Sequence, residues 1–171
     1  MSIPALKKEY KLGPMVEGDW KAVRAIYLDG IATGQATFET TAPDWTTWNQ
    51  NHLPSCRLVV RLEGQVIGWA ALSPVSRRAA YAGVAGVSVY VAAASQGQGA
   101  GKALLQELIS ASERAGIWTL QSGIFPENLA SLAIHKACGF RELGYRERVG
   151  QLEGVWRNTL LLERRSRIVG V

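Results

Sequence analysis

The sequence predicts an α/β protein whose mixed sheet is flanked by helices, and two observations support this prediction. Helical and strand periodicities follow one another as helices, then strands, then a strand–helix–strand–helix–strand–strand series, which does not match a doubly wound Rossmann fold. A chain of 171 residues with 47% hydrophobic residues is apolar enough to bury one core. We therefore expect a single domain over residues 1–171, with residues from about 164 to 171 as a C-terminal tail.

The first half of the chain predicts two helices followed by a hairpin. Residues 19–33 place apolar side chains at helical spacing behind Asp19, a residue type that caps helices well. Residues 43–48 open a second, short helix that stops before Pro54. Residues 57–74 then predict two strands joined by a glycine-containing turn.

The second half predicts alternating strands and helices with glycines at the breaks. Gly116 and Gly139 end the two helices, because glycine adopts the left-handed conformation that closes a helix. The predicted elements are, in order, a strand at 87–91, a helix at 101–115, a strand at 118–124, a helix that begins at 126–128, and strands at 140–149 and 155–162. A glycine-rich turn separates the last two strands.

Composition argues against several function classes. Several of the charges sit in residues 163–167, which we interpret as a solvated tail, and basic and aromatic residues do not interleave, so nucleic-acid binding is not expected. Cys56 and Cys138 lie far apart without neighbouring ligands, which predicts neither a metal site nor a disulfide. The N-terminus lacks a signal-peptide pattern and no apolar run reaches about 18 residues, so we expect a cytoplasmic protein without membrane contact.

The segment 88–109, SVYVAAASQGQGAGKALLQELI, combines a strand, a glycine-rich loop and a helix. Such a loop exposes backbone N–H groups at a helix N-terminus, where phosphate groups bind. A P-loop would need Ser or Thr after the lysine, but Ala103 follows Lys102, and the glycine spacing differs from that of a dinucleotide-binding fingerprint. A flexible connection would account for the glycines alone. None of these three interpretations accounts for the SVYV strand.

A fourth interpretation accounts for both features. Residues 96–101, QGQGAG, match the (Arg/Gln)-x-x-Gly-x-(Gly/Ala) pyrophosphate loop of the GNAT superfamily of acetyl-CoA-dependent N-acetyltransferases. The segments that resemble this superfamily in order are 26–31, 36–40, 66–74, 88–91, 126–140 and 154–164. Together they resemble the phosphinothricin N-acetyltransferase branch, whose members acetylate the α-amino group of phosphinothricin, methionine sulfone or methionine sulfoximine.

The resemblance has consequences for fold, activity and partners. It implies a mostly antiparallel sheet with a splayed central strand pair, acetyl-CoA as co-substrate without a metal, and a homodimer. The implied reaction is acetyl transfer to the α-amino group of a small amino acid-like acceptor. Two alternatives are an acetyltransferase that acts on protein amines and a CoA-binding module with weak or no turnover.

The resemblance also implicates residues in cofactor binding. A splayed strand offers unpaired backbone groups to the pantetheine arm, here at Val89, Tyr90 and Val91. Asn128 corresponds to an asparagine that holds this arm, although it fits a helix N-cap equally well. The residues expected at the pyrophosphate are Gln96, Gly97, Gln98, Gly99, Ala100, Gly101 and Lys102.

Two positions bear on proton transfer. His135 stands where superfamily members carry the group that protonates the departing CoA thiolate, which implies an acid or a cofactor contact, with a structural histidine as the alternative. The base of this branch is a glutamate two residues before SVYV, but Gly86 stands there. The amine proton would then leave through water or through another acid such as Glu39, or the chain is a weakened or noncatalytic variant.

The acceptor is expected to carry a carboxylate or phosphinate, and such a group favours an arginine fork. Arg77 and Arg78, in the loop before the SVYV strand, are best placed for it by analogy. Phe38, Glu39 and Tyr81 are expected to line the same pocket.

Overall fold

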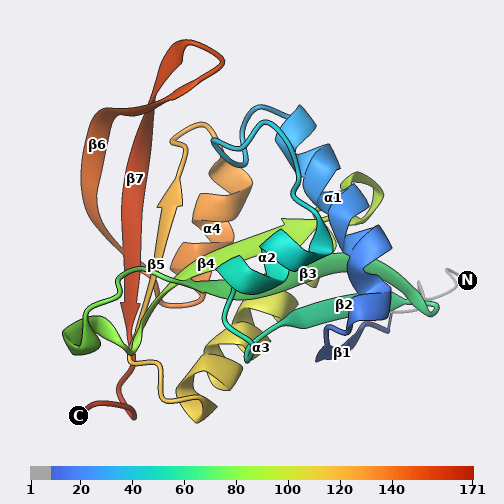
Figure 1. Cartoon of the computed structure of the whole chain (residues 1–171), viewed down its shortest axis with the longest axis horizontal. Helices are drawn as coiled ribbons and strands as arrows, with labels where there is room; N and C mark the ends of the chain where they lie inside the picture. Colours follow the sequence, from blue (N-terminus) through green and yellow to red (C-terminus); the bar gives the residue numbers. More distant parts are fainter. Residues whose placement is uncertain (1–8) are drawn as a thin grey trace, which may run out of the picture.

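The structure, a computed structural model, describes residues 9–171 as a seven-stranded sheet with helices on both faces (Figure 1). The strand order is β1-β2-β3-β4-β5-β7-β6, in which β4 and β5 are parallel and the other neighbours antiparallel. The elements are β1 (Lys11–Pro14), α1 (Trp20–Ala32), α2 (Trp45–Asn51), β2 (Leu58–Leu62), β3 (Gln65–Pro74), β4 (Val84–Val91), α3 (Ala100–Arg114), β5 (Thr119–Ile124), α4 (Leu129–Ala137), β6 (Arg141–Leu152) and β7 (Val155–Arg165). The predicted mixed, mostly antiparallel sheet is confirmed.

The structure adds one strand that the sequence does not predict. β1 pairs with β2, with Gly13 opposite Val59. Its four residues, KLGP, give no strand signal because strands disfavour glycine and proline. Pro14 is tolerated because β1 lies at the edge of the sheet, where one side needs no hydrogen-bond donor.

β4 and β5 are hydrogen-bonded neighbours over only three residues each. Residues 84–86 pair with residues 119–121. Beyond Gly86, β4 continues beside β3, and β5 continues beside β7 as far as Ile124. This confirms the predicted splayed pair, and it leaves one row of β4 backbone groups facing the gap without a strand partner in the described chain.

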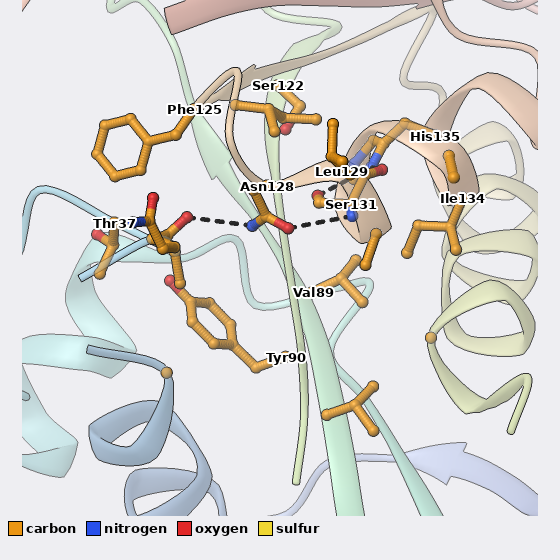
Figure 2. Close-up of a pocket in the computed structure, with 18 of the residues that line it drawn as sticks. Thr37, Val89, Tyr90, Ser122, Phe125, Asn128, Leu129, Ser131, Ile134 and His135 are labelled. Atoms are coloured by element: carbon orange, nitrogen blue, oxygen red, sulfur yellow. Dashed lines mark hydrogen bonds between the residues drawn. The ribbon is translucent and has the colours of Figure 1, made fainter. Parts of the chain in front are cut away.

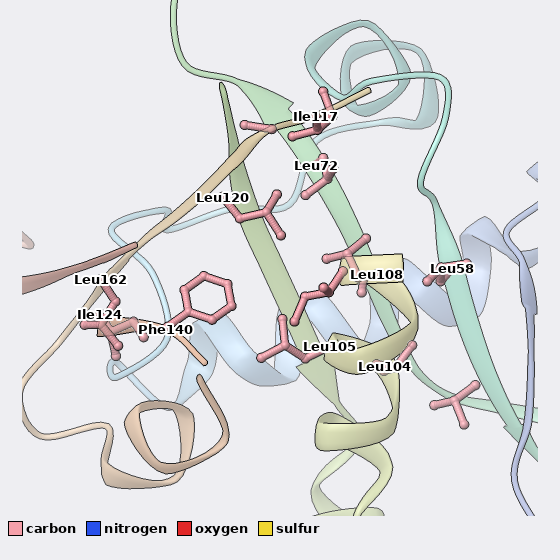
Figure 3. Packing of buried hydrophobic residues seen from close by; sticks show 14 of the residues in the cluster. Leu58, Leu72, Leu104, Leu105, Leu108, Ile117, Leu120, Ile124, Phe140 and Leu162 are labelled. Atoms are coloured by element: carbon pink, nitrogen blue, oxygen red, sulfur yellow. The ribbon is translucent and has the colours of Figure 1, made fainter. Parts of the chain in front are cut away.

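Two hydrophobic clusters hold the helices against opposite faces of the sheet. α3 and α4 cover an aliphatic cluster in which Leu104, Leu105 and Leu108 are fully buried (Figure 3). α1 and α2 cover an aromatic cluster in which the rings of Trp48 and Trp69 meet edge to face, 5.7 Å apart. The sheet is therefore buried on both faces in its central part.

β4 contributes to both clusters, because successive side chains of a strand point to opposite sides. Its odd-numbered residues from 87 to 91 pack against the α3 cluster. Tyr90 packs on the α1 side, stacked on Trp69 with 4.8 Å between the ring centroids. Gly86 and Ser88 share the side of Tyr90.

Glu163, Arg164 and Arg165 belong to the folded sheet, so the prediction of a solvated tail is wrong for these charges, whereas Arg167 is exposed beyond the sheet. β7 continues to Arg165, opposite Thr119. The Glu113 carboxylate accepts hydrogen bonds from Arg164 at 3.0 Å and from the Ser166 hydroxyl at 2.9 Å. Burial raises the pKa of Glu113, but these donors outweigh it and hold that pKa below its ordinary value. The local sequence does not indicate these contacts, because Arg164 and Ser166 lie 51 and 53 residues from Glu113 along the chain.

Within residues 9–171, the helices are too short or too polar to cross a bilayer. In the same part of the chain, no three His, Cys, Asp or Glu side chains gather as metal ligands. Residues 1–8, to which the expectation about a signal peptide applies, lie outside the described residues.

Candidate active site

A cleft of about 880 Å³ opens where β4 and β5 separate (Figure 2). Its walls come from the loop after α1, the second half of β4, the end of β5 and the beginnings of α3 and α4. Figure 2 shows Thr37 and Tyr90 on one side of the cleft and Ile134 and His135 on the other. The cleft thus passes between the two halves of the sheet.

The β4 wall of the cleft offers backbone groups as well as side chains. Val89, Tyr90 and Val91 line the cleft beyond the last residue that pairs with β5. An extended ligand in the gap takes the place of a neighbouring strand, because it satisfies the backbone N–H and C=O groups that β5 leaves unpaired.

The start of α3 closes one end of the cleft with left-handed glycines. Gly97 and Gly99 have φ angles of 71° and 90°, a region that other residue types rarely adopt. Gly99 is the N-cap of α3, and no side chain bonds to the cap. The first N–H groups of the helix therefore face this end of the cleft with the positive end of the helix dipole, which favours an anion.

Most of the predicted loop residues line the cleft, and two do not. Gln98 points elsewhere: its amide donates to the Ala94 carbonyl at 3.2 Å, and its own carbonyl accepts from Tyr10 at 2.8 Å. Ala100 is buried in the α3 cluster. The predicted loop residues that line the cleft are Gln96, Gly97, Gly99, Gly101 and Lys102.

Asn128 joins α4 to the loop after α1. Its Oδ1 accepts a hydrogen bond from the Ser131 N–H at 3.2 Å, which makes Asn128 the N-cap of α4 (Figure 2). Its Nδ2 donates to the Gln35 carbonyl at 3.2 Å. An amide side chain has two donor and two acceptor positions, so capping leaves capacity toward the cleft that Asn128 lines.

His135 lines the cleft although it is only 2% exposed. Its Nδ1 lies 2.7 Å from the Ser131 carbonyl oxygen, which assigns the ring proton to Nδ1 as donor. Nε2 is then an acceptor, and no group in the described chain bonds to it. Burial lowers the pKa of His135, and the bond to Ser131 offsets this only in part, so the ring is neutral near pH 7.

Arg157 of β7 fixes the wall formed by the loop after α1. Its guanidinium donates to the Gly34 carbonyl at 2.8 Å and to the Gln35 side-chain oxygen at 2.9 Å. The same group lies 4.1 Å from the centre of the Phe125 ring, which meets the Phe38 ring edge to face at 4.9 Å. These contacts hold two aromatic rings at the edge of the cleft.

The sequence pattern of the Acetyltransferase (GNAT) family matches residues 20–140, which include the split strands and the loop before α3. The chain belongs to this family. It is therefore an acetyl-CoA-dependent N-acetyltransferase.

Two curated relatives of this GNAT acetyltransferase carry acceptor names. It is 36% identical over 157 residues to a phosphinothricin N-acetyltransferase of Alcaligenes faecalis, across 86% of this chain and 78% of that protein. It is 28% identical over 144 residues to the L-methionine sulfoximine/L-methionine sulfone acetyltransferase of Pseudomonas aeruginosa, across 81% of this chain and 84% of that protein.

Two solved structures resemble the GNAT acetyltransferase over nearly its whole length. A phosphinothricin acetyltransferase from Sinorhizobium meliloti in complex with acetyl-CoA has a TM-score of 0.82 and 30% identity, across 91% of this chain and 88% of that chain. A ribosomal-protein-alanine N-acetyltransferase from Brucella melitensis has a TM-score of 0.84 and 31% identity, across 91% and 99%. Because their names give different acceptors, the shared fold does not select the acceptor.

Gly86 lies at the point where β4 leaves β5. It is paired with Ser73 of β3, and a Cβ at this position would lie 3.2 Å from the Ser73 Oγ. Since Gly86 shares the α1 side of β4 with Ser88 and Tyr90, a longer side chain here would point to the same side as these two cleft residues. The GNAT acetyltransferase therefore lacks a carboxylate at this position.

Glu39 is exposed and is not one of the cleft-lining residues, but its charge reaches the cleft. Burial raises the pKa of Tyr90 and of Tyr27, and the negative charge of Glu39 raises both further. Thr37 opposes this rise by lowering the pKa of both tyrosines, and its hydroxyl accepts a hydrogen bond from the Glu39 N–H at 3.1 Å. Glu39, the acid that the sequence suggests, thus lies at the rim of the cleft, close enough for its charge to act on Tyr90.

The structure does not bring Arg77, Arg78 and Tyr81 into the cleft lining, whereas Phe38 is there. The Arg78 guanidinium lies 5.5 Å from the centre of the Tyr81 ring, in the segment that joins β3 to β4. That segment precedes the paired end of β4, and the cleft opens at the other end of the strand. Binding of an acceptor carboxylate by the two arginines stays a prediction.

Sequence reasoning missed part of the cleft. The missed residues do not carry a chemical signal of their own, because a serine, glycine, phenylalanine or threonine at a single position does not indicate a binding site. Only the expectation that ligand-binding residues cluster where β4 and β5 separate points toward the end of β5. The missed lining residues include Ser122, Gly123, Phe125, Ser131 and Thr159.

The buried neutral ring of His135 predicts its titration. The chain has two histidines, so the NMR signals of their ring protons are assigned with a single variant, His52→Gln. We expect a midpoint below the ordinary 6.5, because desolvation opposes the charged ring. Because the folded pKa of His135 lies below the unfolded one, the buried neutral ring lowers the free energy of unfolding only in acid. The stability of the fold is unaffected above about pH 6.5 and decreases as the pH falls from there toward the folded pKa. A midpoint at or above 6.5 contradicts the assignment.

Proposed function

We propose that this GNAT acetyltransferase transfers acetyl to the α-amino group of a small amino acid-like acceptor of the phosphinothricin, methionine sulfone or methionine sulfoximine type. The observation that carries the proposal is the cleft at the β4–β5 split, with an anion-binding helix start at one end and aromatic and hydroxyl side chains elsewhere in its lining. The names of relatives at 36% and 28% identity supply the acceptor class.

The proposed donor site relies on the main chain. The backbone of Val89, Tyr90 and Val91 would hold the pantetheine arm, and the start of α3 would hold the pyrophosphate, with Lys102 adding positive charge. Acetyl-CoA supplies the acetyl group as a thioester. An unpaired N–H of β4 would stabilise the negative charge that develops on the carbonyl oxygen during transfer.

His135 would serve as a cofactor contact rather than as the acid. Its Nδ1 proton is committed to the Ser131 carbonyl, and its Nε2 carries no proton to give. Nε2 would instead accept a hydrogen bond from an N–H or O–H donor in the cleft. An acid is not essential here, because a thiol with a pKa of about 8.5 leaves readily as the thiolate.

The acceptor ammonium must lose a proton before it attacks, and Gly86 supplies no base. We propose that the proton leaves through water on the α1 side of the cleft, with Glu39 at the rim as its nearby acceptor. Proton transfer to water is less efficient than proton transfer to a positioned carboxylate, so we expect real but slow turnover.

Thiol release from acetyl-CoA tests the proposal, with phosphinothricin, methionine sulfone and methionine sulfoximine as acceptors and calorimetric titration of CoA in parallel. We expect CoA binding and acceptor-dependent release with at least one of the three. Binding without release would contradict the acceptor class, and no CoA binding would contradict the donor site.

Two glycines give this test a matched control. Gly99→Ala strains a left-handed residue at the cap of α3, and we expect it to weaken CoA binding about tenfold. Gly154→Ala strains a comparable residue, with φ of 81°, in the turn between β6 and β7. It should leave CoA binding unchanged.

Restoring a carboxylate at position 86 tests the proton route. Gly86→Glu should raise kcat about tenfold or more, because a positioned base replaces water. The Ser73 hydroxyl, 3.2 Å from the added Cβ, can rotate away. Gly86→Gln is the control of equal size without the charge, and equal rates for the two variants would show that no base is missing.

We also propose a homodimer. β6 is the outer strand of the sheet, and with the start of β7 it exposes large apolar side chains, among them Tyr145 at 57% and Trp156 at 56%. Exposed apolar surface of this kind marks interfaces. Light scattering after size exclusion should give twice the 18.6 kDa mass of the chain, and Trp156→Glu should give the monomer. A monomeric wild-type protein would contradict the proposal.

A protein N-terminal amine is the second candidate acceptor. It is favoured by the name of the Brucella melitensis structure, at 31% identity. A peptide that begins with alanine, added to the same thiol-release assay, separates the two. Release with the peptide and none with the three small acceptors would replace the first proposal by the second.

A further inference from the structure

We propose that the Thr159 hydroxyl donates a hydrogen bond to an oxygen on the acceptor side chain, and thereby selects acceptors with an oxidised sulfur or phosphorus over their unoxidised analogues. The inference rests on the proposed function and adds a specificity-determining residue to it. Four observations about β7 and the neighbouring cleft support it.

The first observation is a buried hydroxyl without a partner. Thr159 is 4% exposed, and its Oγ1 makes no hydrogen bond in the described chain. Most buried hydroxyl groups have a partner, because desolvating a polar group without one is unfavourable. Among the cleft-lining residues that the structure describes, only the Thr159 Oγ1 and the His135 Nε2 are buried polar atoms in this condition.

The second observation is the face of the sheet on which the hydroxyl lies. Leu160 and Leu162 of β7 pack into the cluster under α3 and α4. Strand alternation therefore directs Thr159 to the opposite face, the α1 side, which is also the side of Ser88 and Tyr90. His135 comes from α4, on the first face. The two unpartnered atoms thus belong to opposite sides of the cleft.

The third observation is open space between β4 and β7. β5 lies between these strands, and its Gly123 is paired with Leu161, two residues beyond Thr159. Gly123 lines the cleft, and a Cβ added there would meet nothing within 4 Å. A small group can therefore lie over Gly123, within the part of the cleft that Thr159 lines.

The fourth observation is the apolar surroundings. Phe125 is 4% exposed and packs against Phe38, and Phe38 in turn lies against Gly150 of β6, where an added Cβ would be 3.0 Å from its ring. The nearby Thr37 hydroxyl accepts a hydrogen bond from the Glu39 N–H at 3.1 Å. Thr159 therefore offers a buried, unpartnered donor to a polar group that enters beside these rings.

The chemistry of the acceptor class fits this donor. Sulfone, sulfoximine and phosphinate groups carry oxygens that accept hydrogen bonds, whereas a thioether sulfur accepts them weakly. A hydroxyl rotates to suit its partner, and bonding to such an oxygen would pair the Oγ1 that the free protein leaves unpaired. The unoxidised analogue would leave it unpaired, and the difference becomes selectivity.

The test compares methionine sulfone with methionine as acceptors for wild type, Thr159→Val and Thr159→Ser. Valine keeps the shape and removes the hydroxyl, whereas serine keeps the hydroxyl. We expect the ratio of kcat/KM for sulfone over methionine to fall at least about fivefold in Thr159→Val and to be largely kept in Thr159→Ser. CoA affinity should be unchanged in both variants.

Thermal unfolding gives an independent measurement. Thr159→Val should unfold at the wild-type temperature or above it, because an unpartnered buried hydroxyl is replaced by a methyl group. A lower unfolding temperature would mean that the hydroxyl has a structural partner, which would overturn the inference. A selectivity ratio that is unchanged in Thr159→Val, with active wild type, would also overturn the inference but would leave the proposed function intact. Wild-type protein that turns over none of the three proposed acceptors would overturn both.

Discussion

The short pairing between β4 and β5 is the constraint on which the rest of the site depends. β4 is held by β3 through seven residue pairs and β5 by β7 through six, but only three pairs join the two strands to each other. Each half of the sheet is therefore firmly built, and the gap lies where they meet. Longer pairing would consume the backbone groups that line the cleft, and no pairing would remove the support that holds its two walls in register.

The two walls differ in what they offer. On the α4 wall, the histidine ring is held neutral by burial and by its bond to a helix carbonyl, so it adds an acceptor without adding charge. On the α1 wall, aromatic rings and hydroxyl groups come from the loop after α1, β4 and β7. Arg157 of β7 hydrogen-bonds to that loop, and these bonds fix the loop against the sheet.

Local signals in the sequence predicted the parts of the fold that local interactions determine. Asp44 caps α2 through the Thr47 N–H, and Gly116 ends α3 with a φ of 80°. The loop resemblance likewise located the start of α3. Contacts between distant segments left no local signal: neither Glu113 with Arg164 nor Arg157 with Gly34 follows any motif. Arg77 and Arg78 are not among the residues that line the cleft, because closeness in the chain to a site residue does not give closeness along an extended strand.

The main-chain construction of the donor side has an evolutionary consequence. Substitutions along β4 change side chains but not the backbone groups that face the gap, so relatives that diverge widely in sequence would still accept the donor if it binds as proposed. The proposed acceptor side depends on a few side chains from separate segments, so a single substitution there would change the acceptor without disturbing the fold. The structures from Sinorhizobium meliloti and Brucella melitensis both resemble this chain closely, and their names nevertheless give different substrates. For such relatives, the identities at positions 38, 86 and 159 should carry more information about substrate range than overall identity does.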